Sequence, residues 1–160
     1  MRRAREAALP DAVRIALERL LGARVDHVRV IEHSWFARLH GRAVATTRPG
    51  RIYLRGSAAD LFADPWLMLH EYCHVISQWE AGTLTVARYL IECLRRGYWN
   101  NRFEVEARDF ADAQVASLRT LLARAPPPRA TVPLAQQRFA PVETSGDGEQ
   151  QRAERQRRDD

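Results

Sequence analysis

The chain has 160 residues, of which 46% are hydrophobic, enough to fill the core of one domain, and no apolar run approaches the ~20 residues that a transmembrane helix needs. Its start is basic but leads into Ala7-Ala8-Leu9-Pro10 rather than into a long apolar stretch, so we expect no Sec-type signal peptide. The net charge is +5, and all 25 basic residues are arginines spread over several predicted elements without interleaved aromatic residues, which favours a solvated basic surface over a nucleic-acid interface.

The first part of the chain mixes helix and strand signals. Leu9-Pro10-Asp11 is a good helix start, because proline suits the first turn and aspartate complements the helix dipole, and Gly22 ends that helix. Arg48-Pro49-Gly50 separates two strand-like segments and predicts a β-hairpin. The predicted elements are a helix over 9–21, a strand over 25–31, a short helix over 34–40, and strands over 43–47 and 52–54.

From Ala63 onward the pattern is helical. Asp64-Pro65 begins a helix that Gly82 ends, and further helices are expected from about Thr85 to Arg96 and from about Phe103 to Leu122. Pro126-Pro127-Pro128 ends the ordered pattern. The residues that follow are mostly polar or charged, which predicts a disordered tail over 126–160.

The segment that carries chemistry is His70-Glu71-Tyr72-Cys73-His74, which has the spacing H-E-x-x-H. Residues four apart lie on one face of a helix, so both imidazoles can reach a single Zn²⁺ ion. Glu71, between them, can then act as the general base that takes a proton from water that zinc acidifies. The alternative is a pair of ordinary helix histidines satisfied by hydrogen bonds.

A third zinc ligand is expected from the helix that begins near Phe103. Glu104, 30 residues after His74, is the first choice and Glu106 the second. The small residues Ala107 and Ala111 share the helix face of Glu104 and would allow two helices to approach closely. The alternative is that both glutamates are surface acids in a first helical turn, where the dipole favours them.

A hydrolase also needs a donor that stabilises the developing oxyanion. Tyr72, Tyr98, Tyr53 and Arg108 are candidates, and the sequence does not choose among them. Tyr98-Trp99 could form one wall of a cleft, although an aromatic cap on the core is the favoured interpretation. Cys73 lies between the two histidines in sequence, but its helical position turns it away from them, so we expect it to pack in the core.

Several segments follow one another in a fixed order: Leu9-Pro10, Val28-Arg29-Val30, Ala43-Val44-Ala45-Thr46, Gly50-Arg51-Ile52-Tyr53-Leu54 and Leu69 to Gln78. This order, over residues 9–80, resembles the metallopeptidase domain associated with extracellular contractile injection systems, the eCIS core domain. In that family a Leu-Pro helix leads through Val-Arg-Val, Ala-x-Thr and Gly-x-x-Ile strands to a helix with H-E-x-x-H-V-x-x-Q.

Further along, Glu104-Val105-Glu106-Ala107 followed by Phe110-Ala111 resembles the E-x-x-A-[DN]-x-F-A helix of gluzincin-type peptidases. In those enzymes the glutamate ligates zinc, which corresponds to Glu104. They often have Asp or Asn directly after the alanine, to support a ligand, whereas this chain has Arg108. The nearby Asp109 is the candidate for that supporting role.

The residues and the resemblance together predict an α+β, zincin-like metallopeptidase domain over 9–125, with a small N-terminal β-sheet and a helical C-terminal half. The resemblance implies a peptide or protein substrate, association with a contractile injection system, and Ile52-Tyr53-Leu54 as an edge strand that pairs with extended substrate. The alternative is a catalytically inactive zinc-binding or protein-interaction domain.

The cysteine content bears on the compartment. Cys73 and Cys93 are too few for a disulfide framework and lack zinc-finger spacing, so we expect two reduced thiols. This favours a bacterial cytoplasmic location, with any export through a non-Sec injection machine.

Overall fold

The computed structural model describes residues 4–39 and 44–125. The chain divides into two compact units, and the description below concerns the first, residues 1–127. The predicted tail over 126–160 lies outside the described residues, and the predicted domain limits stay a prediction.

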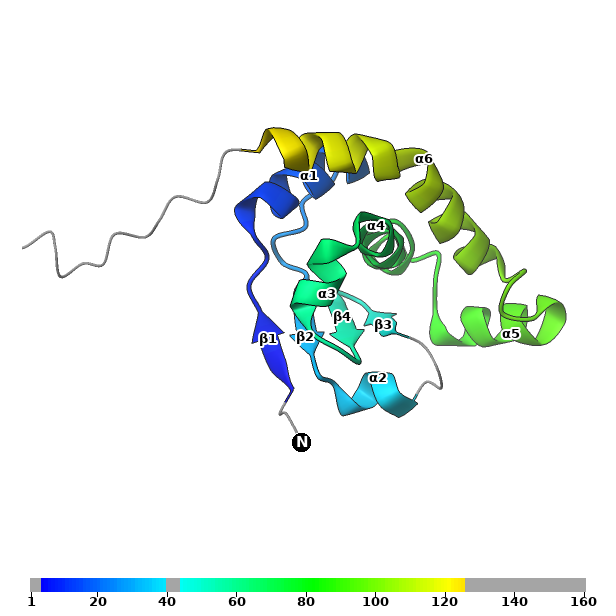
Figure 1. Ribbon diagram of the computed structural model, residues 1–160. Coiled ribbons are helices and arrows are strands. Elements are labelled where there is room, and N and C mark those ends of the chain that lie inside the picture. Colours follow the sequence, from blue (N-terminus) through cyan, green and yellow to red (C-terminus); the bar gives the residue numbers. More distant parts are fainter. Residues whose placement is uncertain (1–3, 40–43, 126–160) are drawn as a thin grey trace, which may run out of the picture. The chain divides into compact units, whose positions relative to one another are not determined.

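The elements have the α+β character that the sequence predicts, with one small sheet and a helical majority (Figure 1). In chain order they are β1 (Arg5–Ala7), α1 (Asp11–Leu21), β2 (Arg29–Glu32), α2 (Trp35–Leu39), β3 (Ala45–Arg48), β4 (Arg51–Leu54), α3 (Ala58–Ala63), α4 (Pro65–Cys73), the π-helix η1 (His74–Glu80), α5 (Val86–Arg96) and α6 (Arg102–Arg124).

The four strands form one sheet in the order β1-β2-β4-β3. β2 runs parallel to β4, and the two outer pairs are antiparallel. The prediction that Ile52-Tyr53-Leu54 is an edge strand is therefore wrong, because this segment belongs to β4, which lies between β2 and β3. The strand at that edge of the sheet is β3. Its place at the edge results from the pairing of β2 with β4, two segments far apart in sequence, and the periodicity within one strand does not predict such pairing.

The predicted hairpin is confirmed, with Arg48 opposite Arg51 and Gly50 at a φ of 63°, in the left-handed region that favours glycine. The predicted strand over 25–31 is shorter in the structure. Residues 25–28 form a turn in which the Val28 amide donates to the Val25 carbonyl at 3.0 Å. Val25 and Val28, two of the alternating apolar residues in this segment, are buried, but neither pairs with a neighbouring strand of the sheet.

The predicted helix after Asp64 is present, but as two kinds of helix in succession. Asp64 caps α4 by accepting from the amides of Trp66 and Leu67, and Pro65 occupies the first turn. At His74 the α-helix continues as the π-helix η1. Two elements were not predicted from the sequence: the strand β1 and the short helix α3, which begins with a capping box between Ser57 and Asp60.

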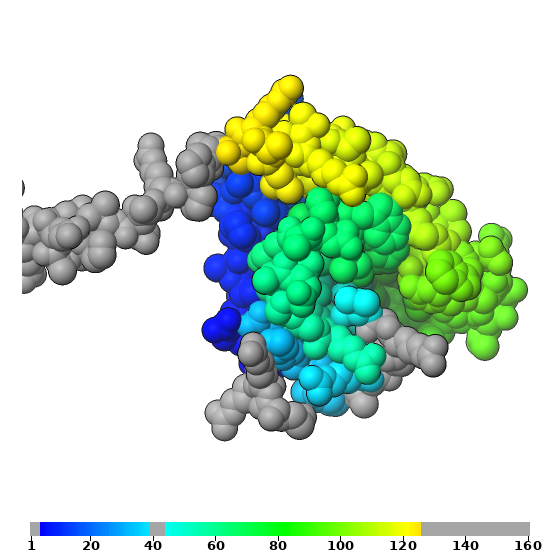
Figure 2. Space-filling model, in the orientation of Figure 1, coloured from blue at the N-terminus to red at the C-terminus, as the bar shows by residue number. Residues whose placement is uncertain are grey.

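The core lies between the sheet and the layer of α1, α4 and α6. The long helix α6 packs along α4 and α1, and the space-filling view shows α6 (yellow) against α4 (green) (Figure 2). Each buried leucine or isoleucine there stabilises the fold by roughly 1.5–3 kcal/mol. Core residues with little or no exposed surface include Leu17, Ile52, Leu54, Leu69, Tyr72, Val75, Ala111 and Leu118.

Helix α5 differs from the other long helices because none of its residues is buried. Its apolar side chains Val86, Leu90, Ile91 and Leu94 are exposed. Within residues 4–39 and 44–125, no helix combines the length and the apolar character that crossing a bilayer requires.

Candidate metal centre

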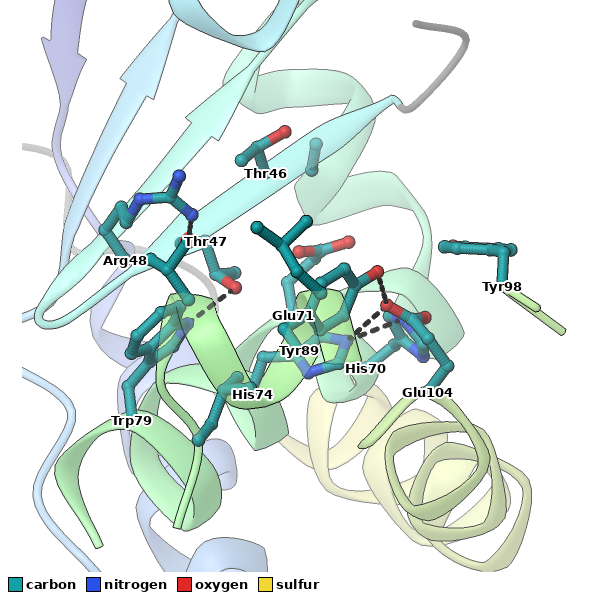
Figure 3. A pocket seen from close by; sticks show the side chains of 14 residues that line it. Thr46, Thr47, Arg48, His70, Glu71, His74, Trp79, Tyr89, Tyr98 and Glu104 are labelled. Carbon is teal, nitrogen blue, oxygen red and sulfur yellow. Dashed lines mark hydrogen bonds and ion pairs between the residues drawn. The ribbon is translucent and has the colours of Figure 1, made fainter. Parts of the chain in front are cut away.

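Three buried side chains from separate elements meet in one place. His70 lies near the end of α4, His74 is the first residue of η1, and Glu104 lies in the first turn of α6. One ligand atom from each lies within 4.8 Å of the others. Helix α6 packs along α4, with its small residues Ala107 and Ala111 fully buried, and this packing brings the glutamate to the two histidines. Figure 3 shows the three side chains together at the pocket surface.

The separations of these atoms fit a small cation with tetrahedral ligands. The Nε2 atoms of His70 and His74 are 3.1 Å apart. Glu104 Oε2 lies 3.4 Å from the His70 Nε2, and Glu104 Oε1 lies 3.7 Å from the His74 Nε2. Ligands about 2.0–2.1 Å from a tetrahedral zinc ion lie roughly 3.3 Å from one another. The group could therefore bind a metal ion.

Gln78 sets the orientation and the tautomer of His74. Its amide Nε2 donates to the Phe103 carbonyl at 2.9 Å and to Glu106 Oε2 at 3.1 Å, so its Oε1 faces His74. That oxygen can only accept, so the His74 Nδ1, 2.7 Å away, carries the proton. In the neutral ring the Nε2 lone pair then points at the space between the three side chains.

Glu104 is held as a carboxylate on the other side of this space. The Tyr89 hydroxyl of α5 donates to Glu104 Oε1 at 2.7 Å, while Oε2 is buried without a hydrogen-bond partner among the described residues. Burial by itself raises the pKa of Glu104, but the neighbouring His70 and His74 and the Tyr89 hydroxyl outweigh it and hold the pKa well below its ordinary range. An ionised oxygen without a partner, beside imidazole lone pairs, suits a cation.

Glu71 lies beside the ligand group but does not belong to it. Its side chain is buried and lines the same pocket as His70 and His74. Burial raises its pKa, while the two histidines act in the opposite direction. Glu71 therefore faces the same space as the candidate ligands.

The structure separates the two candidate third ligands. Glu104 is buried and faces the histidines, whereas Glu106 is exposed and accepts from Gln78. Asp109, the expected supporting acid, is exposed and does not line the pocket. The contacts that hold the candidate ligands come from Gln78 and Tyr89. Gln78 belongs to the motif that carries the family resemblance, whereas Tyr89 was not predicted, because nothing in the local pattern around Tyr89 relates it to Glu104.

The four candidate oxyanion donors occupy different places. Only Tyr98 lines the pocket, and burial together with the nearby Glu104 raises its pKa to about 12. Tyr72 is completely buried in the core, and Tyr53 packs its ring against Phe36. Arg108 donates to the Trp99 carbonyl.

The favoured interpretation of Tyr98-Trp99 as a cap on the core is wrong, since 51% of Tyr98 and 72% of Trp99 are exposed. Cys73 packs in the core as predicted and is 2% exposed. Burial raises the pKa of its thiol to about 11.

The site opens into a cavity of about 480 Å³ between β3 and α5 (Figure 3). One wall consists of the edge strand, with Thr46, Thr47 and Arg48. The opposite wall is apolar, with Leu84, Val86 and Leu90. The candidate ligands and Glu71 therefore face a space large enough for several residues of an extended peptide.

The comparison with known families covers the part of the chain that carries the two histidines and Glu71. No curated protein and no solved structure matches the chain. A family model described as the eCIS core domain matches residues 8–82, a span that includes His70, Glu71 and His74 but not Glu104. Over these residues the chain is similar to the eCIS core domain.

Proposed function

We propose that this protein is a zinc-dependent peptidase whose metal is held by His70, His74 and Glu104. The observation that carries the proposal is the meeting of these three side chains at ligand-ligand distances, beside Glu71 and at the surface of an open cavity. The zincin-like fold and the identity of the metal are part of the same proposal. Two imidazoles and one carboxylate are a donor set that suits zinc.

A zinc ion bound by these residues would supply Lewis acidity, lowering the pKa of a water molecule and polarising a carbonyl group. The chain holds the ligands in position through the Gln78 contact with His74 and the Tyr89 contact with Glu104. Burial of all three ligands excludes bulk water from the sides of the site.

Glu71 moves the proton in the proposed reaction. Its carboxylate accepts a proton from water as the water oxygen bonds to the carbonyl carbon of the substrate. It then delivers that proton to the amide nitrogen as the carbon–nitrogen bond breaks, which leaves a carboxylic acid and an amine. The Tyr98 hydroxyl, at the pocket surface, is the candidate donor to the developing oxyanion.

The similarity to the eCIS core domain over residues 8–82 supports a partner. We propose that the protein associates with a contractile injection system. Its substrate would then be a peptide or protein that the machine or its target cell supplies.

Metal analysis of the purified protein tests the ligand assignment. We expect one zinc ion per chain in the wild type and its loss in His70→Ala and in Glu104→Ala. Asp109→Ala is the matched control, since it removes an exposed acid of the same helix that does not line the pocket. Zinc retained in Glu104→Ala, or absent from a wild type offered zinc, would contradict the site.

Peptidase activity tests the chemistry separately. On a denatured protein substrate such as casein, we expect Glu71→Gln to lower the cleavage rate by about 10²–10⁴-fold while its zinc content stays unchanged. Equal cleavage by wild type and variant would remove Glu71 from the mechanism.

A second candidate function is a metal-stabilised protein-interaction domain, which the exposed apolar side chains of α5 favour. Zinc binding without cleavage of any substrate by the wild type would support it. In that case the metal should still raise the melting temperature, because ligands that bind only the folded state stabilise it.

A further inference from the structure

We propose that Arg48 forms a carboxylate-binding subsite at one end of the cavity. It would receive an acidic side chain or the C-terminal carboxylate of a peptide substrate. The inference rests on the proposed peptidase function for the identity of the occupant. The arginine site itself rests on contacts that are independent of the metal ligands.

The position of Arg48 places its charge in the cavity. It is the last residue of β3, the edge strand, and lines the cavity together with Thr46 and Thr47. In Figure 3, Arg48 and Trp79 lie at one side of the cavity and Tyr98 lies at the opposite side, with the histidines and Glu104 between them in this view. A peptide that occupies the cavity beside β3 would pass the guanidinium.

The guanidinium is held in place by aromatic rings. Its central carbon lies 5.2 Å from the centroid of the Phe36 ring and 5.7 Å from that of the Trp79 ring. Trp79 is fixed in turn, because its indole Nε1 donates to Thr47 Oγ1 at 3.2 Å. Cation–π contacts hold an arginine without neutralising its charge and without consuming its N–H donors.

Most of the hydrogen-bonding capacity of Arg48 remains available. One terminal nitrogen donates to the Thr47 carbonyl at 3.0 Å, and no acidic side chain among the described residues pairs with it. By contrast, Arg5, Arg14, Arg24, Arg29 and Arg96 each form an ion pair with a carboxylate. The acids of the cavity, Glu71 and Glu104, lie beside the histidines instead.

These features select a carboxylate as the ligand. A planar guanidinium with free donors matches the two oxygens of a carboxylate and can bind both at once. Because the side chain is half-buried and already oriented, little conformational entropy would be lost when the ligand binds. Among the described residues that line the cavity, Arg48 is the only arginine. It alone therefore provides a planar guanidinium that can donate to both oxygens of a carboxylate.

The test measures binding, not cleavage, on the chelator-treated full-length protein. The protein is immobilised and offered three pools of acetylated random hexapeptides. One pool is amidated and lacks acidic residues, one is amidated with a single glutamate per peptide, and one lacks acidic residues but keeps a free C-terminal carboxylate. Retained peptides are quantified by mass spectrometry. The second pool reports a side-chain carboxylate and the third a terminal one.

We expect the wild type to retain one of the two carboxylate pools about tenfold more than the neutral pool, the size of a charge-assisted hydrogen bond. Arg48→Gln should abolish this preference. Arg48→Lys should keep only part of it, because lysine retains the positive charge but lacks the planar guanidinium that binds both carboxylate oxygens. Arg51→Gln is the matched control. It removes the same charge from the position opposite Arg48 in the hairpin, outside the cavity, and should keep the preference.

Equal retention of the three pools by the wild type, or retention of none, would overturn the subsite. An unchanged preference in Arg48→Gln would also overturn it, since the carboxylate would then bind elsewhere. The outcome is independent of the peptidase proposal, which the metal content and the cleavage assay decide. A carboxylate preference in a protein that cleaves nothing would uphold the subsite and reject the enzyme.

Discussion

Tyr89 and Gln78 hold the candidate metal ligands from two different elements. Tyr89 donates to Glu104 from α5, and Gln78 accepts from His74 within η1. Neither side chain belongs to the ligand group, yet each restricts the orientation of a ligand atom. Such supporting contacts commonly change metal affinity by 10–100-fold.

Replacing Tyr89 by phenylalanine removes the hydroxyl that donates to Glu104 Oε1 and leaves the ring in place. We expect the affinity for zinc to fall about tenfold, because the carboxylate loses the contact that orients it. Competition with a chromophoric chelator measures the change. Tyr53→Phe, outside the cavity, is the control and should bind zinc as the wild type does. Unchanged affinity in Tyr89→Phe would show that Glu104 is oriented without it.

The element that carries Gln78 is also suited to its role. In a π-helix the hydrogen bonds span five residues, so each turn contains more residues than a turn of α-helix. Side chains four apart therefore lie more nearly above one another, and Gln78 comes to 2.7 Å from the His74 Nδ1. π-helical segments often occur at functional sites, and this one begins at a candidate ligand.

Helix α5 is held by polar contacts at the start of α6. Asn101 caps α6 through its Oδ1, which accepts from the Phe103 amide at 3.0 Å. Its Nδ2 donates to the Tyr89 carbonyl at 3.3 Å and contacts the Cys93 sulfur at 3.2 Å. With its apolar side chains exposed, α5 depends on few buried contacts, so its position relies on this amide.

Replacing Asn101 by serine separates the two roles of this residue. Serine caps a helix as well as asparagine but has no amide group to donate to α5. We expect hydrogen exchange in α5 to become about fivefold faster, since a lost hydrogen bond of about 1 kcal/mol lowers its local stability. Exchange in α4 should stay unchanged and serves as the internal control. Equal protection of α5 in variant and wild type would contradict this anchoring.

At the scale of the whole unit, α6 connects the core to the site. It packs along α4, its small residues Ala107 and Ala111 are fully buried, and the same helix places Glu104 beside the histidines. Farther along, Leu118 packs in the core that α1 and the sheet share. The close approach of two helices thus determines both the packing and the ligand geometry.

Ala107→Leu tests this coupling by adding bulk at the crossing. We expect it to destabilise the fold by about 1–3 kcal/mol, as overpacking does, and to weaken zinc binding because Glu104 is displaced from His70 and His74. Urea unfolding and zinc titration measure the two effects. Ala113→Leu, an exposed position on the same helix, should change neither. Normal zinc affinity in a destabilised Ala107→Leu would show that packing and ligand geometry are independent.

Signals between near neighbours were sufficient to predict much of this protein from its sequence. Gly22 ends a helix and Asp64-Pro65 begins one as expected, because caps and breakers act within one turn. The H-E-x-x-H spacing placed His70 and His74 on one helix face for the same reason. The hairpin at Gly50 also followed from local turn chemistry.

Only the tertiary structure decided which residues distant in the chain contact these locally predicted elements. Strand order made β3 the edge in place of β4, because pairing of β2 with β4 joins segments that the helix α2 and the strand β3 separate in the chain. Helix crossing turned Glu104, rather than Glu106, towards the histidines and brought Tyr89 to it. These outcomes depend on packing between elements far apart in the chain, and side-chain periodicity within one element carries no information about its neighbours.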